Sequence, residues 1–391
     1  MDAPRSALIE EKDMNFGFSE EQRDVQNLAR EILSDMVKPE KLKASDSYEN
    51  ERFDEALWGK LAKAGLLGVA VDEAHGGMGF GFIELALLIE EAGRTIAPVP
   101  LISNLVAAAL PLQKFGNDEQ KQRLLPGVVS GALQLSAALM EEQNENPATP
   151  MLTTATKQGD DYTLSGVKLC VPFAHRAERI LLSAKTDAGV VVLLLDPNAA
   201  GVTLEPMKVT TYEPQFEVVM EDVHVAASDV LAGADNGAEV MQWLSEHTMA
   251  AICAHQVGAT DVATRMTASY TAERKQFGVP IATFQAVGHR AANCFIDVEC
   301  LRLNTYQAVS RLSGGLSATN EVQIAKIWAG DVGHRVSYAS QHLHGGMGID
   351  RDYPLWRYCT WMRHNEMMLG SSAKTLRDLG KRIAAGDAFC S

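Results

Sequence analysis

The residues with the clearest capacity for chemistry lie between positions 274 and 285. There an Arg, an aromatic, a Gly, a Pro and an amide follow one another as Arg274, Phe277, Gly278, Pro280 and Gln285. Gly permits a tight turn and Pro prevents a helix from continuing. An Arg fork beside an amide suits a pyrophosphate and the polar edge of a nucleotide. The stretch therefore predicts a nucleotide-binding turn, and a plain connection between two helices is the alternative.

A second stretch carries closely spaced glycines. It runs from Gln341 through Gly345, Gly346 and Gly348, and Arg-Asp-Tyr-Pro follows at residues 351–354. Glycines let a backbone approach another molecule closely, although they also end helices. Both stretches follow long helical patterns, so the same kind of scaffold is expected to present them.

The patterns along the chain predict three domains, mainly α with one β-domain. Ser19 and Gln22 form a capping box that begins the first of several helices, expected at about 20–37, 53–64, 81–96, 101–115 and 117–130. Short alternating strands then predict a small β-barrel or sandwich. Four long helical patterns follow, at about 236–273, 283–313, 317–344 and 354–385, and predict a four-helix bundle. We therefore expect an all-helical domain over 15–130, a β-barrel over 131–235 and a bundle over 236–391.

Composition limits the partners and the compartment. The net charge of −15 argues against nucleic acid or an anionic membrane as a partner. The six cysteines include no C-x-x-C pair and suit small core residues in a reducing cytoplasm, and no metal site is expected. Residues 1–12 are charged and lack an apolar run, and residues 1–14 are expected to form a tail. No stretch is long and apolar enough to cross a membrane, so we expect a cytoplasmic protein.

The two stretches together resemble the acyl-CoA dehydrogenase family. That family carries R-x-x-F-G-x-x-[ILV]-x-x-x-Q, and later Q-x-x-G-G-x-G followed by R-[DE]-Y-P, and the order and spacing match here. The order of the three domains matches too, so the resemblance covers nearly the whole chain. It implies an FAD enzyme of lipid metabolism that oxidises an acyl-CoA thioester to the 2-enoyl-CoA, with an electron-transfer flavoprotein as acceptor. A carboxylate base would remove the α proton while the flavin takes a hydride.

The resemblance also assigns roles to residues. In the family, the two segments hold the adenine and pyrophosphate end of an FAD bound across a subunit interface. The residues that would take this role here are Arg274, Phe277, Gln285, Gln341, Gly345 and Gly346.

The flavin-ring half of the family pattern is missing. The family's M-T-E-P-x-A-G-S-D segment is replaced by the run from Leu139 to Pro147, without its Thr, Gly and Ser. In place of W-I-[TS]-N, the chain has Cys170 where the Trp packs on the ring and Pro172 where a hydroxyl reaches it. Pro172 has neither a hydroxyl nor an N–H to donate.

The usual base is missing as well. Leu369 occupies the Glu position of the family's Y-E-G-T-S segment, and Leu cannot accept a proton. Some members carry the base on the first bundle helix, where this chain has Thr248. Glu246 lies near that position and is a weak candidate, since a shift of one or two residues turns a helix side chain by about 100 to 200°.

One interpretation accounts for both the matches and the gaps. Some bacterial members are α₂β₂ heterotetramers of two related chains, as reported for enzymes acting on steroid side-chain CoA thioesters. One chain holds the flavin ring and the base, and the other keeps the adenine-end residues. This chain resembles the second kind. The alternatives are a complete homotetramer with an unusual base such as Glu246 or Glu366, a non-catalytic acyl-CoA-binding or scaffold protein, and a flavin monooxygenase or nitroalkane oxidase of the same fold.

Overall fold

The first helix begins at the predicted capping box. In a computed structural model, which describes residues 17–386, the Ser19 side chain accepts a hydrogen bond from the Gln22 amide, and the Gln22 side chain accepts one from the Ser19 amide. Helices then follow as α1 Glu20–Met36, α2 Pro39–Ser45, α3 Glu55–Lys63, α4 Phe82–Thr95, α5 Leu110–Phe115 and α6 Asp118–Ser130. Two features were not predicted: the short helix α2, and the π-helical turns of Ile102–Ala109 that precede α5. The predicted tail at 1–14 lies outside the described residues.

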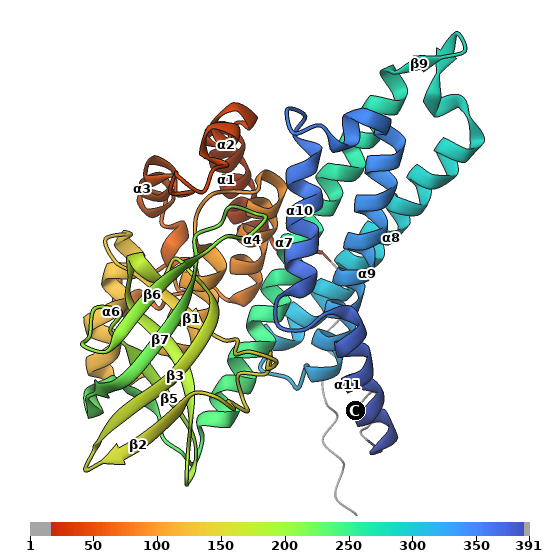
Figure 1. The fold of residues 1–391 in the computed structure, drawn as a ribbon. Helices are drawn as coiled ribbons and strands as arrows, with labels where there is room; N and C mark the ends of the chain where they lie inside the picture. The colour runs from red at the N-terminus through yellow and green to blue at the C-terminus, as the bar shows by residue number, and fades with distance from the viewer. Residues whose placement is uncertain (1–16, 387–391) are drawn as a thin grey trace, which may run out of the picture.

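The middle of the chain forms one eight-stranded sheet, to the left of the helical bundle in Figure 1. Its strand order is β6-β7-β3-β2-β4-β5-β8, and β1 pairs with β4. The strands are β1 Gln134–Ala138, β2 Thr154–Gln158, β3 Asp161–Pro172, β4 Ala177–Thr186, β5 Gly189–Leu195, β6 Val202–Met207, β7 Gln215–Val225 and β8 Val230–Ala232. The β3–β7 register shifts between Lys168 and Val171. Such a bulge redirects side chains locally, and it lies at Cys170.

The C-terminal part is helical, with α7 Gly237–Glu273, α8 Gln285–Ser313, α9 Thr319–His344, α10 Leu355–Met367 and α11 Ser372–Ala384. The first three match the predicted patterns. The single helix predicted over 354–385 is wrong, because it is two helices. Leu369 and Gly370 have φ of 54° and 105°, and the Ser371 side chain caps α11. A left-handed pair cannot continue an α-helix, so the break falls at the position of the family's base.

The N-terminal helices are fixed to the bundle through the crossing of α4 and α7. Both helices have a glycine at the contact: a Cβ on Gly93 would lie 2.1 Å from the His255 carbonyl oxygen, and one on Gly258 would lie 2.0 Å from that of Glu90. Only glycine permits so close a backbone approach. The two helices therefore pack without intervening side chains at this point.

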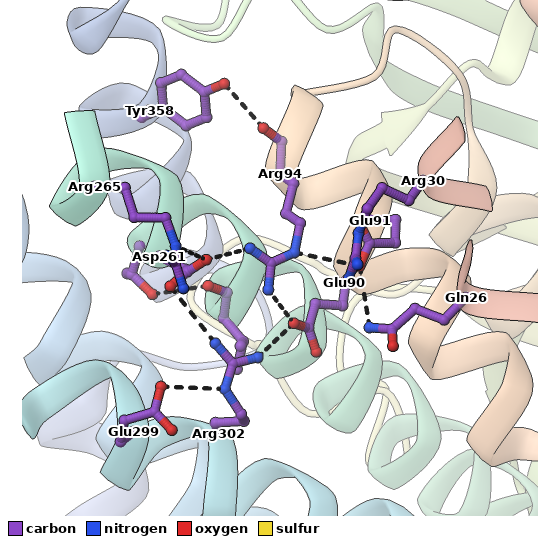
Figure 2. Close-up of polar contacts among 12 residues, drawn as sticks. Gln26, Arg30, Glu90, Glu91, Arg94, Asp261, Arg265, Glu299, Arg302 and Tyr358 are labelled. Atoms are coloured by element: carbon purple, nitrogen blue, oxygen red, sulfur yellow. Dashed lines mark hydrogen bonds and ion pairs between the residues drawn. The ribbon is translucent and has the colours of Figure 1, made fainter. Parts of the chain in front are cut away.

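A cluster of charged groups built on three buried carboxylates surrounds the crossing, and we call it the interdomain clamp (Figure 2). Arg94 binds three carboxylates, and two of them also bind Arg302; the members are Arg30, Glu90, Glu91, Arg94, Asp261, Arg265, Arg302 and Tyr306. Burial alone would lower the pKa of Arg94, but Glu90, Asp261 and Glu91 raise it. The clamp joins α1 and α4 to α7 and α8.

The predicted fold class is confirmed: a helical N-terminal part, a middle β-sheet and a helical C-terminal part. The domain limits 15–130, 131–235 and 236–391 remain predictions. Among residues 17–386, no helix is long and apolar enough to cross a membrane, and no group of His, Cys, Asp or Glu could hold a metal ion.

Candidate functional site

One end of the helical bundle gathers both predicted nucleotide-binding stretches. There the C-terminal end of α7 meets that of α9, where the Tyr270 and His344 rings stack with centroids 4.3 Å apart. The N-terminal end of α8 also meets α9, where Arg290 donates a hydrogen bond to His342. Arg274 follows α7, Gln285 begins α8 and Gln341 lies in the last turns of α9. The three helix ends therefore bring the two stretches to the same end of the molecule.

The first stretch is a hairpin that projects from this end at the top right of Figure 1, with strands β9 Lys275–Gln276 and β10 Val279–Pro280. Phe277 and Gly278 form its tip with φ of 54° and 84°. The Phe277 side chain is 93% exposed, and its edge meets the Phe284 ring at 6.3 Å between centroids. Within residues 17–386, the Arg274 guanidinium has no side-chain partner and is exposed. A large exposed aromatic beside a free Arg is expected where a further molecule binds.

The second stretch presents bare backbone. Gly345 has φ of 60° and ψ of −136°, a conformation open to glycine and strained for other residues. No described atom lies within 4 Å of a Cβ built on Gly345 or on Gly346, so the space beside them is open. The Gln341 side chain is half-buried beside this loop. The six residues predicted to hold the adenine and pyrophosphate end thus lie on an open surface, and their chemistry fits that part of FAD.

The segment expected to contact a flavin ring is occupied by contacts within the chain. The Glu141 carboxylate binds the Lys168 ammonium at 2.8 Å and accepts hydrogen bonds from the amides of Met151, Leu152 and Thr153. Both charged side chains are 1% exposed. Burial would raise the pKa of Glu141, but Lys168 and the amides lower it to about 2. This loop keeps the Glu141 carboxylate engaged within the chain, and a buried ion pair at this position does not fit a flavin ring.

The remaining ring and base positions surround a cavity of about 80 Å³ between α4, β1, β3, α7 and α10. Cys170, Pro172 and Thr248 line it, and Leu369 is buried beside the lining residue Met368. The Pro172 carbonyl accepts a hydrogen bond from Ser136. With Pro and Leu at these positions, the cavity has neither the hydroxyl nor the carboxylate that the family pattern places there.

The candidate bases lie elsewhere. Glu246 accepts hydrogen bonds from Thr319 at 2.6 Å and from Gln242 at 2.8 Å, and Glu366 binds Arg363 at 2.6 Å. Neither carboxylate is among the residues that line the cavity. A general base must reach its substrate within hydrogen-bond distance, so the geometry gives no support to Glu246 or Glu366.

Apart from Thr248, sequence reasoning missed the polar residues that line the cavity. The Asn365 side-chain amide donates a hydrogen bond to His255 Nδ1 at 2.9 Å, and His364 Nε2 lies 3.8 Å from the Glu213 carboxylate. These residues come from α7, α10 and the connection between β6 and β7. No sequence motif joins positions so far apart, and only the packing of the three elements places them together.

Burial makes several histidines sensitive to acid. Burial lowers the pKa of His255 to about 3 and that of His247 to about 4, from an ordinary value of 6.5. Both are neutral in the folded and unfolded states above pH 6.5, whereas below it the unfolded state takes up protons first. Stability is therefore lost as the pH falls from about 6.5 to 4 for His247 and to 3 for His255, by roughly 2 kcal/mol for each histidine at pH 5.

This loss is measured by urea unfolding at pH 7.5 and pH 5. The variant His247→Gln should lose about 2 kcal/mol less than the unmodified chain on acidification. The variant His289→Gln, at an exposed position, should lose as much as the unmodified chain. If all three proteins lost the same free energy of unfolding on acidification, burial of His247 would not be a cause of the acid sensitivity.

Comparison with known proteins identifies the family of this chain. The model of the acyl-CoA dehydrogenase N-terminal domain matches residues 19–132, and that of the C-terminal domain matches residues 235–384. Acyl-CoA dehydrogenase FadE27 of Mycobacterium tuberculosis is 34% identical over 379 residues, which cover 95% of this chain and 99% of that protein. Acyl-CoA dehydrogenase FadE28 of the same organism is 32% identical and covers 84% and 92%.

Two solved structures are similar over nearly their whole length. A chain of a variant of the Tcur3481-Tcur3483 steroid ACAD is 39% identical, with a TM-score of 0.87, and the match covers 94% of this chain and 98% of that one. A chain of the ChsE4-ChsE5 complex from Mycobacterium tuberculosis is 34% identical, with a TM-score of 0.89, and the match covers 95% and 99%. The chain belongs to the acyl-CoA dehydrogenase family, whose members bind FAD.

Proposed function

We propose that this chain is one subunit of a heteromeric FAD-dependent acyl-CoA dehydrogenase, in which it completes the FAD site of a related partner chain. FAD, when bound, accepts a hydride from the acyl chain as the thioester becomes the 2-enoyl-CoA. In this proposal, Arg274 and the Gly345–Gly346 backbone bind the pyrophosphate. Phe277, Gln285 and Gln341 hold the adenine end. The partner chain carries the flavin ring and the base.

The observation that carries the proposal is the contrast between the two halves of the site. Five of the six adenine-end residues are exposed, with Phe277 at 93%, and Gln341 is half-buried beside them, as expected for groups that meet a second chain. The flavin-ring half is engaged with the chain itself, through Glu141 and Lys168, and Leu369 stands at the usual base position. A chain that bound FAD without a related partner chain would need both halves of the site.

The comparisons support the kind of assembly and substrate. Both similar structures carry the names of two chains; one is described as the ChsE4-ChsE5 complex and the other as the Tcur3481-Tcur3483 steroid ACAD. We therefore propose an α₂β₂ heterotetramer that acts on a CoA thioester with a bulky, steroid-type acyl group. An electron-transfer flavoprotein as electron acceptor belongs to the same proposal and rests on the resemblance to the family.

The substitution Arg274→Ala tests the role of this chain in the FAD site. Loss of a charge-assisted hydrogen bond to phosphate should weaken FAD retention in the complex roughly tenfold or more. Lys275→Ala is the matched control, because consecutive residues of an extended chain direct their side chains to opposite sides. FAD retention is measured by flavin absorbance after gel filtration of the complex. Unchanged retention in the Arg274 variant would refute this part of the proposal.

A further inference from the structure

Strained backbone is concentrated around one cavity, the space of about 80 Å³ between α4, β1, β3, α7 and α10. Five non-glycine residues with φ between 50° and 58° either line this cavity or directly adjoin a lining residue: Ile96, Cys170, Phe173, Tyr212 and Leu369. Each such residue costs of order 1–3 kcal/mol and persists only where surrounding contacts impose it. Strain of this kind gathers at ligand sites, so the distribution points to a retained function for the cavity.

A buried hydroxyl in the wall of the cavity lacks a partner. Thr248 on α7 is 3% exposed, and no atom of residues 17–386 forms a hydrogen bond with its Oγ1. A buried hydroxyl without a partner costs about 1–3 kcal/mol. Thr248 is among the lining residues, so a molecule in the cavity can satisfy this oxygen.

The polar wall carries little net charge. Among residues 17–386, neither Lys nor Arg lines the cavity, and Glu213 is the one acidic lining residue. Behind the wall, Arg52 and Arg357 both bind Asp46, and Arg52 is close enough to Glu213 for each to affect the other. Two cations therefore balance two carboxylates. His255 accepts a hydrogen bond from Asn365 through Nδ1, which requires an unprotonated nitrogen.

The rest of the wall is apolar and limits the size of an occupant. Its aliphatic and aromatic members include Ile89, Val99, Leu139, Ile252 and Trp361. A buried water needs roughly 10–15 Å³ of such space, so the cavity admits a compact molecule of several non-hydrogen atoms. A charged molecule would enter without a counter-ion, which is unfavourable in an apolar surrounding.

We propose that this cavity binds a small uncharged molecule with one hydroxyl or carbonyl group, which hydrogen-bonds to Thr248 while its aliphatic part packs on the apolar wall. The binding involves no covalent or redox step, because the cavity has no base at position 369 and no fit for a flavin ring. It goes beyond the function proposed above, because the cavity is enclosed by the ring and base positions, whereas the residues proposed to bind the adenine end lie at the end of the bundle and do not line it.

The experiment uses two fluorinated probes of the same shape. Trifluoroethanol is uncharged with a hydroxyl, and trifluoroacetate is its charged counterpart. The ¹⁹F transverse relaxation of each probe, at low millimolar concentration, is measured with the full chain. We expect concentration-dependent broadening of the trifluoroethanol signal that unlabelled 2-propanol reverses, and no broadening of the trifluoroacetate signal.

Two isosteric variants on the same helix sharpen the test. Thr248→Val removes the hydroxyl in the cavity and should weaken trifluoroethanol binding about fivefold, the loss of one hydrogen bond. Thr264→Val is the matched control, because the Thr264 hydroxyl also has no described partner but does not line the cavity. It should leave binding unchanged. Absence of trifluoroethanol broadening with the unmodified chain, equal broadening by trifluoroacetate, or equal effects of the two variants would overturn the proposal.

Discussion

The variant Lys168→Met should lose about 3–5 kcal/mol of its free energy of unfolding, because it leaves the Glu141 carboxylate buried without its cation. The ion pair spans 2.8 Å, and both side chains are 1% exposed. Three backbone amides still bind Glu141 in the variant, so we expect a loss toward the lower end of that range. Urea unfolding at pH 7.5 measures it.

Two further variants separate the charge from the shape of the side chain. Lys157→Met replaces an exposed Lys on β2 and should change stability by less than about 0.5 kcal/mol. Adding Glu141→Gln to Lys168→Met removes the unpaired charge and should restore part of the stability. A loss below about 1 kcal/mol in Lys168→Met would show that the pair does not fix the loop between β1 and β2.

The variant Arg94→Met should destabilise the chain by a similar amount, about 3–5 kcal/mol, because it breaks the centre of the interdomain clamp. Arg94 binds Glu90 at 2.7 Å, Glu91 at 3.3 Å and Asp261, and the two glutamates are 1% exposed (Figure 2). Arg302 and Arg30 remain to balance part of this charge. They bind Glu90 and Glu91, respectively.

Arg265→Met is the matched control for the clamp. Arg265 binds the same Asp261 at 2.9 Å, but its side chain is 73% exposed. Exposed ion pairs contribute at most about 1 kcal/mol, so this variant should unfold at nearly the urea concentration of the unmodified chain. Equal losses from Arg94→Met and Arg265→Met would mean that burial does not set the strength of the clamp.

Local signals in the sequence predicted much of the structure. The Ser19–Gln22 capping box and the Gly278–Pro280 turn depend on residues within a few positions of one another, and both were found where predicted. The helix predicted over 354–385 failed at Leu369. Nothing in its side chain favours a left-handed backbone, and only contacts with other elements impose φ of 54° there.

Long-range contacts could not be predicted from one sequence. The buried Lys326 ammonium shows this, because it donates to the carbonyls of Asn365, Glu366 and Gly370 and holds the end of α10 from α9. The cavity is a further case, since His255, His364 and Glu213 meet only through packing. For the proposed FAD site, motif spacing named the residues, and the positions of the helix ends show why they share one surface.

The flavin content of the purified chain distinguishes a subunit that completes a partner's FAD site from a chain that binds FAD without a partner. The chain is purified alone and after co-expression with a related acyl-CoA dehydrogenase chain, and flavin absorbance is compared with protein concentration after gel filtration. We expect little or no flavin in the chain alone and about one FAD for every two chains in the complex. About one FAD per chain in the protein purified alone would refute the proposed function, because a complete site would then exist without a partner.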